Sequence, residues 1–123
     1  MKGEFTHHDH GDTMHNLLIM VAKWTAIKKG YSLLDARGIK DKGIFPGEPD
    51  LMIRIDFKGG WNRYIIEVET TPTTASIKKK TNQFTTDGIT ELLIWDVRTL
   101  TKGRDYKDVK LGEMFAWVDG LMP

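Results

Sequence analysis

The most informative stretch of the sequence is residues 50–69, DLMIRIDFKGGWNRYIIEVE. Apolar residues alternate there with polar or charged ones, first over residues 50–57 and again over residues 63–69. A period of two is typical of β-strands, in which successive side chains point to opposite faces of the sheet. We therefore expect two strands joined as a hairpin across Gly59-Gly60.

The glycine pair also predicts how the two strands are aligned. Gly-Gly suits a two-residue hairpin loop because both residues can adopt positive φ. With Gly59 and Gly60 as the loop, Lys58 lies opposite Trp61 and the apolar faces of the two strands coincide. A slip of one residue would set apolar side chains against charged ones. The predicted pairs are Leu51 with Val68, Ile53 with Ile66, Ile55 with Tyr64, and Asp56 with Arg63 as a cross-strand ion pair.

This alignment gathers three acids at one end of one face. Asp50 lies opposite Glu69, and Glu67 is next along the same face. Neighbouring carboxylates without a cation raise each other's pKa, so we expect a bound cation at this end. Oxygen ligands suit magnesium or manganese, which can bind a phosphate and activate a water. The alternative without a functional role is that Pro49-Asp50 is the start of a strand and that the glutamates form a solvated face.

The remaining sequence predicts a mixed sheet with helices on both faces. A helix over residues 13–29 follows Asp12 as N-cap, and a second over residues 72–84 follows Thr71. We expect a short strand over residues 31–36, followed by a loop at 38–48. The continuous apolar run in 91–97 predicts a buried strand. A polar connection at 98–108 is expected to lead into a helix over 111–118. The side chains expected to point inward include Trp24, Ile77, Thr81, Phe84, Trp95 and Trp117.

Length and composition favour one small folded domain. The chain has 123 residues, a formal net charge of +1 and no cysteine. We expect a single domain over residues 13–123 after a flexible, His-rich arm at 1–12. The lack of cysteine excludes disulfides, thiolate nucleophiles and Cys-ligated metals. The start of the chain has no apolar core and the apolar run at 17–22 is too short to span a bilayer, so we expect a cytoplasmic protein without a membrane partner.

Two short segments, GEPD at residues 47–50 and IIEVE at residues 65–69, give the chain a resemblance to a known family. They resemble the PD-(D/E)xK nuclease superfamily, which includes many restriction endonucleases and the archaeal Holliday junction resolvases. The likeness runs from the first helix through the strand at 91–97. It implies an α/β, restriction-endonuclease-like mixed sheet, with an antiparallel hairpin and a parallel crossover strand, flanked by helices.

The resemblance also implies roles for individual residues. Asp50 and Glu67 would be metal ligands, with the Val68 carbonyl as a third, and magnesium or manganese would be the cofactor. Glu69 occupies the position where the family usually has lysine. Either Glu69 orients a water or binds a second ion, or catalysis has been lost. Lys79 or Lys80 of the following helix could supply the missing charge, and we take Lys80 as the catalytic choice.

DNA contacts are expected from two regions of the sequence. A net charge of +1 gives no bulk attraction to nucleic acid, so the argument rests on local placement. The run Lys78, Lys79 and Lys80 could contact phosphates, with Gln83 one turn further on, although such a run is more often a solvated helix face. Trp61 at the hairpin tip could stack on a base. A transition metal could be bound by the four histidines, His7, His8, His10 and His15. The simpler interpretation is that the first three belong to a polar arm and that His15 lies on a helix surface. The family often has an acid on its first helix, and at that place this chain offers Asp12 or His15.

The sequence therefore supports three hypotheses of different classes. The first is a divalent-metal-dependent nuclease that hydrolyses DNA phosphodiester bonds. The alternative is a catalytically inactive nuclease-fold module that binds nucleic acid or a protein partner, and the third is a structural or assembly protein. A homodimer is expected, since the chain is small and the resolvases it resembles act in pairs. The apolar helix at 111–118, with Trp117, is the expected interface.

Overall fold

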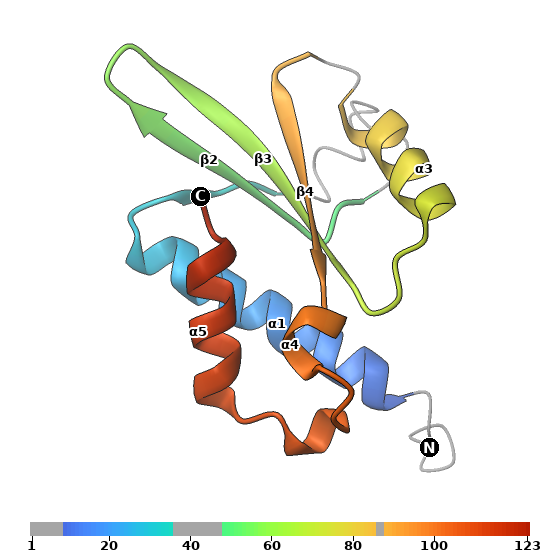
Figure 1. Cartoon of the computed structure of the whole chain (residues 1–123). Helices are drawn as coiled ribbons and strands as arrows, with labels where there is room; N and C mark the ends of the chain where they lie inside the picture. The colour runs from blue at the N-terminus through green and yellow to red at the C-terminus, as the bar shows by residue number, and fades with distance from the viewer. Residues whose placement is uncertain (1–8, 36–47, 86–87) are drawn as a thin grey trace.

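The structure, a computed structural model, describes residues 9–35, 48–85 and 88–123, with side chains from Thr13 onward. These residues form a four-stranded sheet with helices on both faces (Figure 1). The His-rich segment 1–8 and most of the expected loop at 38–48 lie outside the described residues. The elements are α1 Asp9–Lys28, β1 Ser32–Leu33, β2 Leu51–Phe57, β3 Gly60–Glu69, α3 Thr74–Phe84, β4 Thr90–Asp96, α4 Arg98–Thr101, the 3₁₀-helix η1 Tyr106–Asp108 and α5 Leu111–Leu121.

The sheet is mixed, as the sequence predicts. Its order is β1-β2-β3-β4, with β1, β2 and β3 antiparallel and β3 parallel to β4. The α3 helix makes the crossover between the two parallel strands. The predicted order of elements is confirmed, and α4 and η1 add short helical turns within the segment expected to be a polar connection.

The predicted register of the hairpin is wrong by two positions. Leu51 pairs with Ile66 rather than with Val68, and Phe57 pairs with Gly60. The two-residue loop is therefore Lys58-Gly59, in which Gly59 supplies the positive φ of 98°. Because the side-chain period of a strand is two, a shift of two leaves every residue on its predicted face.

The shift does change one predicted ion pair. Asp56 lies opposite Trp61, and Arg63 lies opposite Arg54. Asp56 is bonded instead by Arg54 of its own strand, with 3.0 Å between Nε and Oδ1. Residues i and i+2 share a face of a strand, so this pair forms without any contribution from the neighbouring strand.

Two apolar clusters hold the layers together. The larger lies between the sheet and α1, α5 and the α4 region, and the smaller lies on the opposite face under α3. Trp95 is buried in the larger cluster, and Trp117 packs against it at its edge. Trp24 is 63% exposed, so its predicted core position is wrong. The smaller cluster consists of Met52, Ile65 and Phe84, with Leu34 and Leu92 packed against it.

Two helices begin elsewhere than predicted. The α1 helix starts at Asp9, so residues 9–12 are helical rather than part of an arm. The α3 helix starts at Thr74, with Thr73 rather than Thr71 as its N-cap. The Thr73 hydroxyl accepts from the Ser76 amide, and the Ser76 hydroxyl accepts from the Thr73 amide. This reciprocal capping box satisfies amides that a helix start otherwise leaves unpaired.

The face that α3 turns to the sheet is narrow. Phe84 is its buried residue, whereas Ile77 and Thr81, both predicted to point inward, are exposed. One aromatic side chain therefore anchors the end of this helix. Within the described residues, no helix combines the length and the apolar character needed to cross a membrane.

Candidate metal centre

Three carboxylates converge where β2 begins and β3 ends. Asp50 directly precedes β2, and Glu67 and Glu69 occupy the last residues of β3. One oxygen of each carboxylate lies within 4.8 Å of the other two. Glu67 is buried, and the other two acids are partly exposed. The cluster predicted from the alternation is therefore present, although the register now sets Asp50 beside Glu67 rather than Glu69.

Backbone amides hold two of these carboxylates in place. The Asp50 amide donates to Glu67 Oε2 at 2.6 Å. The Val68 amide donates to Asp50 Oδ2 at 2.9 Å. Each strand thus orients an acid of the other strand, and the register of the hairpin fixes the geometry of the pair. Hydrogen bonds from amides to a carboxylate are charge-assisted and favour its ionised form.

Lys80 of α3 supplies a cation to the cluster. Its Nζ lies 2.7 Å from Glu67 Oε1 and 2.8 Å from Glu69 Oε2. The hairpin itself contributes no cation to this end, and of the two lysines named as possible sources of the missing charge, Lys80 makes the contact whereas Lys79 is exposed. Lys80 precedes Phe84 by four residues and so shares its face of α3. Lys78 and Lys79 are exposed, and Gln83 is half-buried on the same helix.

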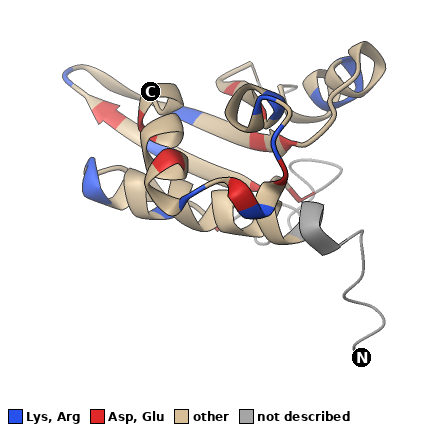
Figure 2. Ribbon diagram, turned by 60° about the horizontal axis from the view of Figure 1, so that its bottom comes forward, with Lys and Arg blue, Asp and Glu red and all other residues tan. Residues whose placement is uncertain are grey.

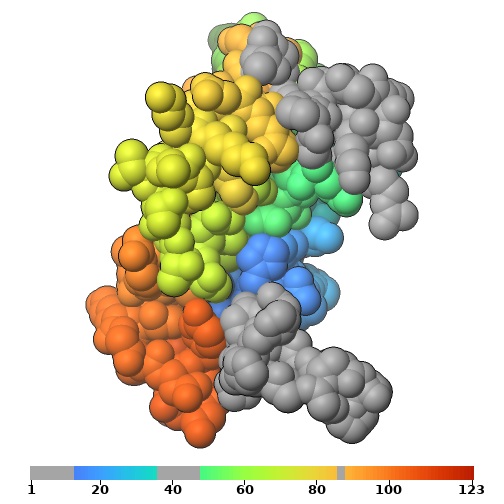
Figure 3. Space-filling model, turned by 90° about the vertical axis from the view of Figure 1, so that its right-hand side faces the viewer, coloured from blue at the N-terminus to red at the C-terminus, as the bar shows by residue number. Residues whose placement is uncertain are grey.

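His15 of α1 reaches the cluster from the other side. Its Nε2 lies 3.0 Å from Asp50 Oδ2, and the side chain is partly buried. The sequence favoured a helix-surface position for His15, but the resemblance also named Asp12 or His15 for the place where the family often has an acid on the first helix, and His15 is the one that contacts Asp50. The sequence spacing could have indicated this contact, because His15 lies three residues before the buried Leu18 and therefore on the same face of α1. Figure 3 shows the start of α1, the start of β2 and α3 side by side on one surface of the molecule.

The pKa shifts follow from this crowding. Burial is the largest cause that raises the pKa of Glu67, and the negative charge of Asp50 adds to it, against the opposing bond from Lys80. The hydrogen bond to Asp50 raises the pKa of His15. Burial disfavours the Lys80 ammonium, but its bonds to Glu67 and Glu69 outweigh burial and raise its pKa.

The balance of charge leaves room for a further cation. Three carboxylates and one ammonium carry a formal charge of about −2, or about −1 when His15 is protonated. Acidic positions gather at this end of the sheet, with basic positions on α3 above them (Figure 2). An oxygen-rich donor set with residual negative charge is the kind that magnesium or manganese prefers. The residues present therefore fit a divalent ion.

An open hollow gives access to Asp50 from solvent. Its volume is about 420 Å³, and its lining combines apolar side chains with the charged residues Lys23, Asp35, Glu48 and Asp50. Such a hollow beside the carboxylates would let a substrate approach the cluster. It is lined by Lys23, Leu33, Leu34, Asp35, Glu48, Pro49, Asp50, Leu51 and Met52.

Trp61 lies far from this cluster along the same strand. Six residues of strand separate it from Glu67, about 20 Å at roughly 3.3 Å per residue. The Arg54 guanidinium lies 4.5 Å from the centroid of the Trp61 ring, and the tryptophan is 40% exposed. The structure therefore brings together Asp50, Glu67, Glu69 and Lys80 of the predicted residues, and keeps Trp61 at the far end of the hairpin.

No protein-family model, curated protein or solved structure matches this chain. The chemistry of the centre therefore rests on the residues described above.

Proposed function

We propose that this chain is a divalent-metal-dependent nuclease that hydrolyses DNA phosphodiester bonds through a centre of the PD-(D/E)xK type. The observation that carries the proposal is the convergence of Asp50, Glu67 and Glu69 within 4.8 Å, with Lys80 in contact with both glutamates. The mixed sheet and its helical crossover support a restriction-endonuclease-like arrangement.

Asp50 and Glu67 would hold magnesium or manganese, with the Val68 carbonyl as a further ligand. When bound, such an ion polarises a phosphate and lowers the pKa of a coordinated water. The Val68 amide and His15 keep Asp50 oriented from two sides. Preorganised ligands of this kind bind an ion without having to be ordered first.

Lys80 and Glu69 would serve the reacting groups directly. In the pattern that the hairpin resembles, a lysine stands at position 69; here the ammonium of Lys80 lies 2.8 Å from the Glu69 carboxylate and so reaches nearly the same place. Lys80 would neutralise charge that develops on the phosphate, and Glu69 would accept a proton from the attacking water. The exposed Lys78 and Lys79 on α3 would contact neighbouring phosphates.

Calorimetric titration of magnesium and manganese, followed by cleavage assays, tests this proposal. Asp50→Asn and Glu67→Gln remove one ligand charge each, and Asp56→Asn is the matched control at the far end of β2. We expect both ligand variants to lose metal affinity by at least about 100-fold, since even groups that only support ligands are worth 10–100-fold. The substrates should include linear, branched and single-stranded DNA, and RNA.

Two results would contradict the proposal that the chain is a metal-dependent nuclease. Absence of metal binding by the wild type would remove its cofactor, and unchanged cleavage by both ligand variants would show that the activity arises elsewhere. The control variant should bind metal and cleave as the wild type does.

One observation favours the alternative, an inactive nuclease-fold module that binds nucleic acid or a protein partner. Lys80 already bridges two of the three acids, so these two acids have a cationic partner within the chain. This module would bind labelled DNA in EDTA and cleave none with any metal. Binding that requires the metal, together with cleavage, would favour the enzyme.

A further inference from the structure

An apolar stripe lies on the surface of α1 and α5. On α1, Met20, Trp24 and Ile27 follow one another at spacings of four and three residues, and on α5 Leu111 and Phe115 are four apart. Their exposed fractions lie between 40% and 63%. Side chains three or four residues apart share one helix face, so each helix presents a continuous apolar edge to solvent.

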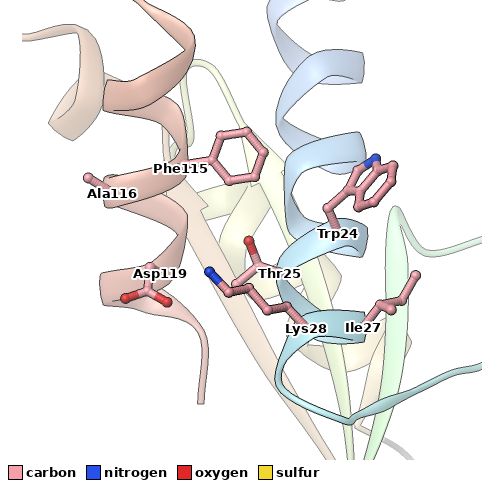
Figure 4. Close-up of a pocket in the computed structure, with 7 residues that line it drawn as sticks. All are labelled: Trp24, Thr25, Ile27, Lys28, Phe115, Ala116 and Asp119. Carbon is pink, nitrogen blue, oxygen red and sulfur yellow. The ribbon is translucent and has the colours of Figure 1, made fainter.

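The two edges border a groove of about 570 Å³ between α1 and α5 (Figure 4). Trp24 and Ile27 lie on one side and Phe115 and Ala116 on the other. At one end the groove carries opposite charges, Lys28 on α1 and Asp119 on α5. The largest apolar patch on a typical monomer is about 300–600 Å², and patches of this size often mark interaction sites.

The exposed area matches what a homodimer requires. With on the order of 200 Å² for each large apolar side chain, the five residues of the stripe leave roughly 500 Å² of apolar surface uncovered. A standard interface buries about 800 Å² per partner, and homodimer interfaces are about 65% apolar, which again is roughly 500 Å².

We propose that a second copy of this chain covers the groove, in a twofold dimer that sets α1 of each copy against α5 of the other. In such an isologous interface the same patch must complement itself. The groove does so, because Trp24 of each copy enters the groove of the other beside Phe115. Asp119 at one end of the groove is paired with Lys29 of its own copy, with 3.6 Å between the charged atoms, so the apolar residues carry the interface. Trp117, the residue first expected at an interface, instead packs edge-to-face on Trp95 at 5.8 Å and donates to Thr99 Oγ1.

This interface leaves the carboxylate cluster open. Asp50 and Lys80 belong to the region where α3 and the β2–β3 ends meet, away from the α5 side of α1 (Figure 1). The proposal therefore does not depend on the nuclease function, and metal binding can be measured separately in every variant.

Sedimentation equilibrium of the full chain with Trp24→Glu tests the dimer. A buried tryptophan at an interface centre is a hot spot, so the dimer dissociation constant should rise by at least about 30-fold. Trp61→Glu, which also changes an exposed tryptophan, is the matched control and should leave the dimer intact. Circular dichroism checks that both variants keep the wild-type fold.

A second test uses the absence of cysteine from the chain. Ala116→Cys places a single thiol on the wall of the groove, where a short bis-maleimide should link two copies. Lys102→Cys, on an exposed turn, should not be linked above the background of random collisions. A wild type that sediments as a monomer at all concentrations, or a dimer that neither Trp24→Glu nor the crosslinking pattern distinguishes from its control, would overturn the proposal.

Discussion

Charged side chains at the two ends of the β2–β3 hairpin find their partners in different ways. Near the tip, Asp56 accepts a hydrogen bond from Arg54, two residues away on the same strand; Arg54 is partly exposed and Asp56 is exposed. At the base, Asp50, Glu67 and Glu69 depend on Lys80 from α3 and His15 from α1.

The difference separates the candidate metal centre from ordinary charged surface. Charges at the tip can be screened by solvent and contribute little to stability. At the base, burial and a neighbouring carboxylate raise the pKa of Glu67. The carboxylates there are balanced only when α1 and α3 pack on the sheet and bring His15 and Lys80 to them. Buried acids whose pKa is shifted by a specific charged neighbour are often found at functional sites.

The largest expected effect comes from removing the side chain that anchors α3 over the base. Phe84→Ala leaves a cavity against Met52 and Ile65 and should lower the free energy of unfolding by about 3–5 kcal/mol. Phe57→Ala at the exposed tip is the matched control and should cost less than about 1 kcal/mol. Urea unfolding of both variants measures the contrast, and equal losses would contradict it.

Removing the cation of the base should have the next largest effect. Lys80→Met leaves the buried Glu67 without its ion pair and should destabilise the metal-free protein by about 2–4 kcal/mol. Magnesium should restore more stability to this variant than to the wild type, because the ion can replace the missing charge. Thermal unfolding with and without magnesium tests this, with the exposed Lys79→Met as control; an equal magnesium effect in all three proteins would refute it.

The histidine contact should appear as a pH dependence. Because the pKa of His15 is raised above its ordinary 6.5, its contact with Asp50 stabilises the fold fully below pH 6.5 and loses this effect as pH rises through the raised value. His15→Gln should therefore lower the free energy of unfolding of the metal-free protein by about 1 kcal/mol near pH 5.5 and by less near pH 9. Denaturant unfolding across this range measures the difference, and a pH-independent loss would count against the ion pair.

The smallest effect is expected at the tip. Arg54→Ala removes a partly exposed ion pair with Asp56 and the stacking on Trp61, together worth about 0.5–1 kcal/mol. Metal affinity should not change, because Arg54 lies four residues, about 13 Å, from Asp50 along β2. Calorimetry showing a changed affinity for Arg54→Ala would mean that the two ends are coupled.

Much of the fold could be predicted because its signals are local. Alternation identified both strands of the hairpin, and the apolar run at 91–97 identified β4. The register was missed because Gly59-Gly60 looked like a loop, whereas Gly60 pairs with Phe57 and the loop is Lys58-Gly59. Since the error was an even number of residues, the carboxylates still fell on one face.

Positions on the helices were predicted less well than the strands. Trp24 and Ile77 fit an apolar periodicity and yet are exposed, because periodicity does not say how much of a helix face its neighbours cover. His15 and Lys80 were hard to place for the same reason: each contacts the cluster only through the docking of its helix on the sheet.

The sequence by itself determined the order of the elements, the face of each strand and the gathering of Asp50, Glu67 and Glu69, because a strand's side-chain direction depends only on the parity of its residues. Only the tertiary structure decided that Lys80 bridges two glutamates, that His15 holds Asp50 and that Trp24 borders an open groove. These contacts depend on how whole helices pack, which is set by the summed burial of side chains far apart in the chain.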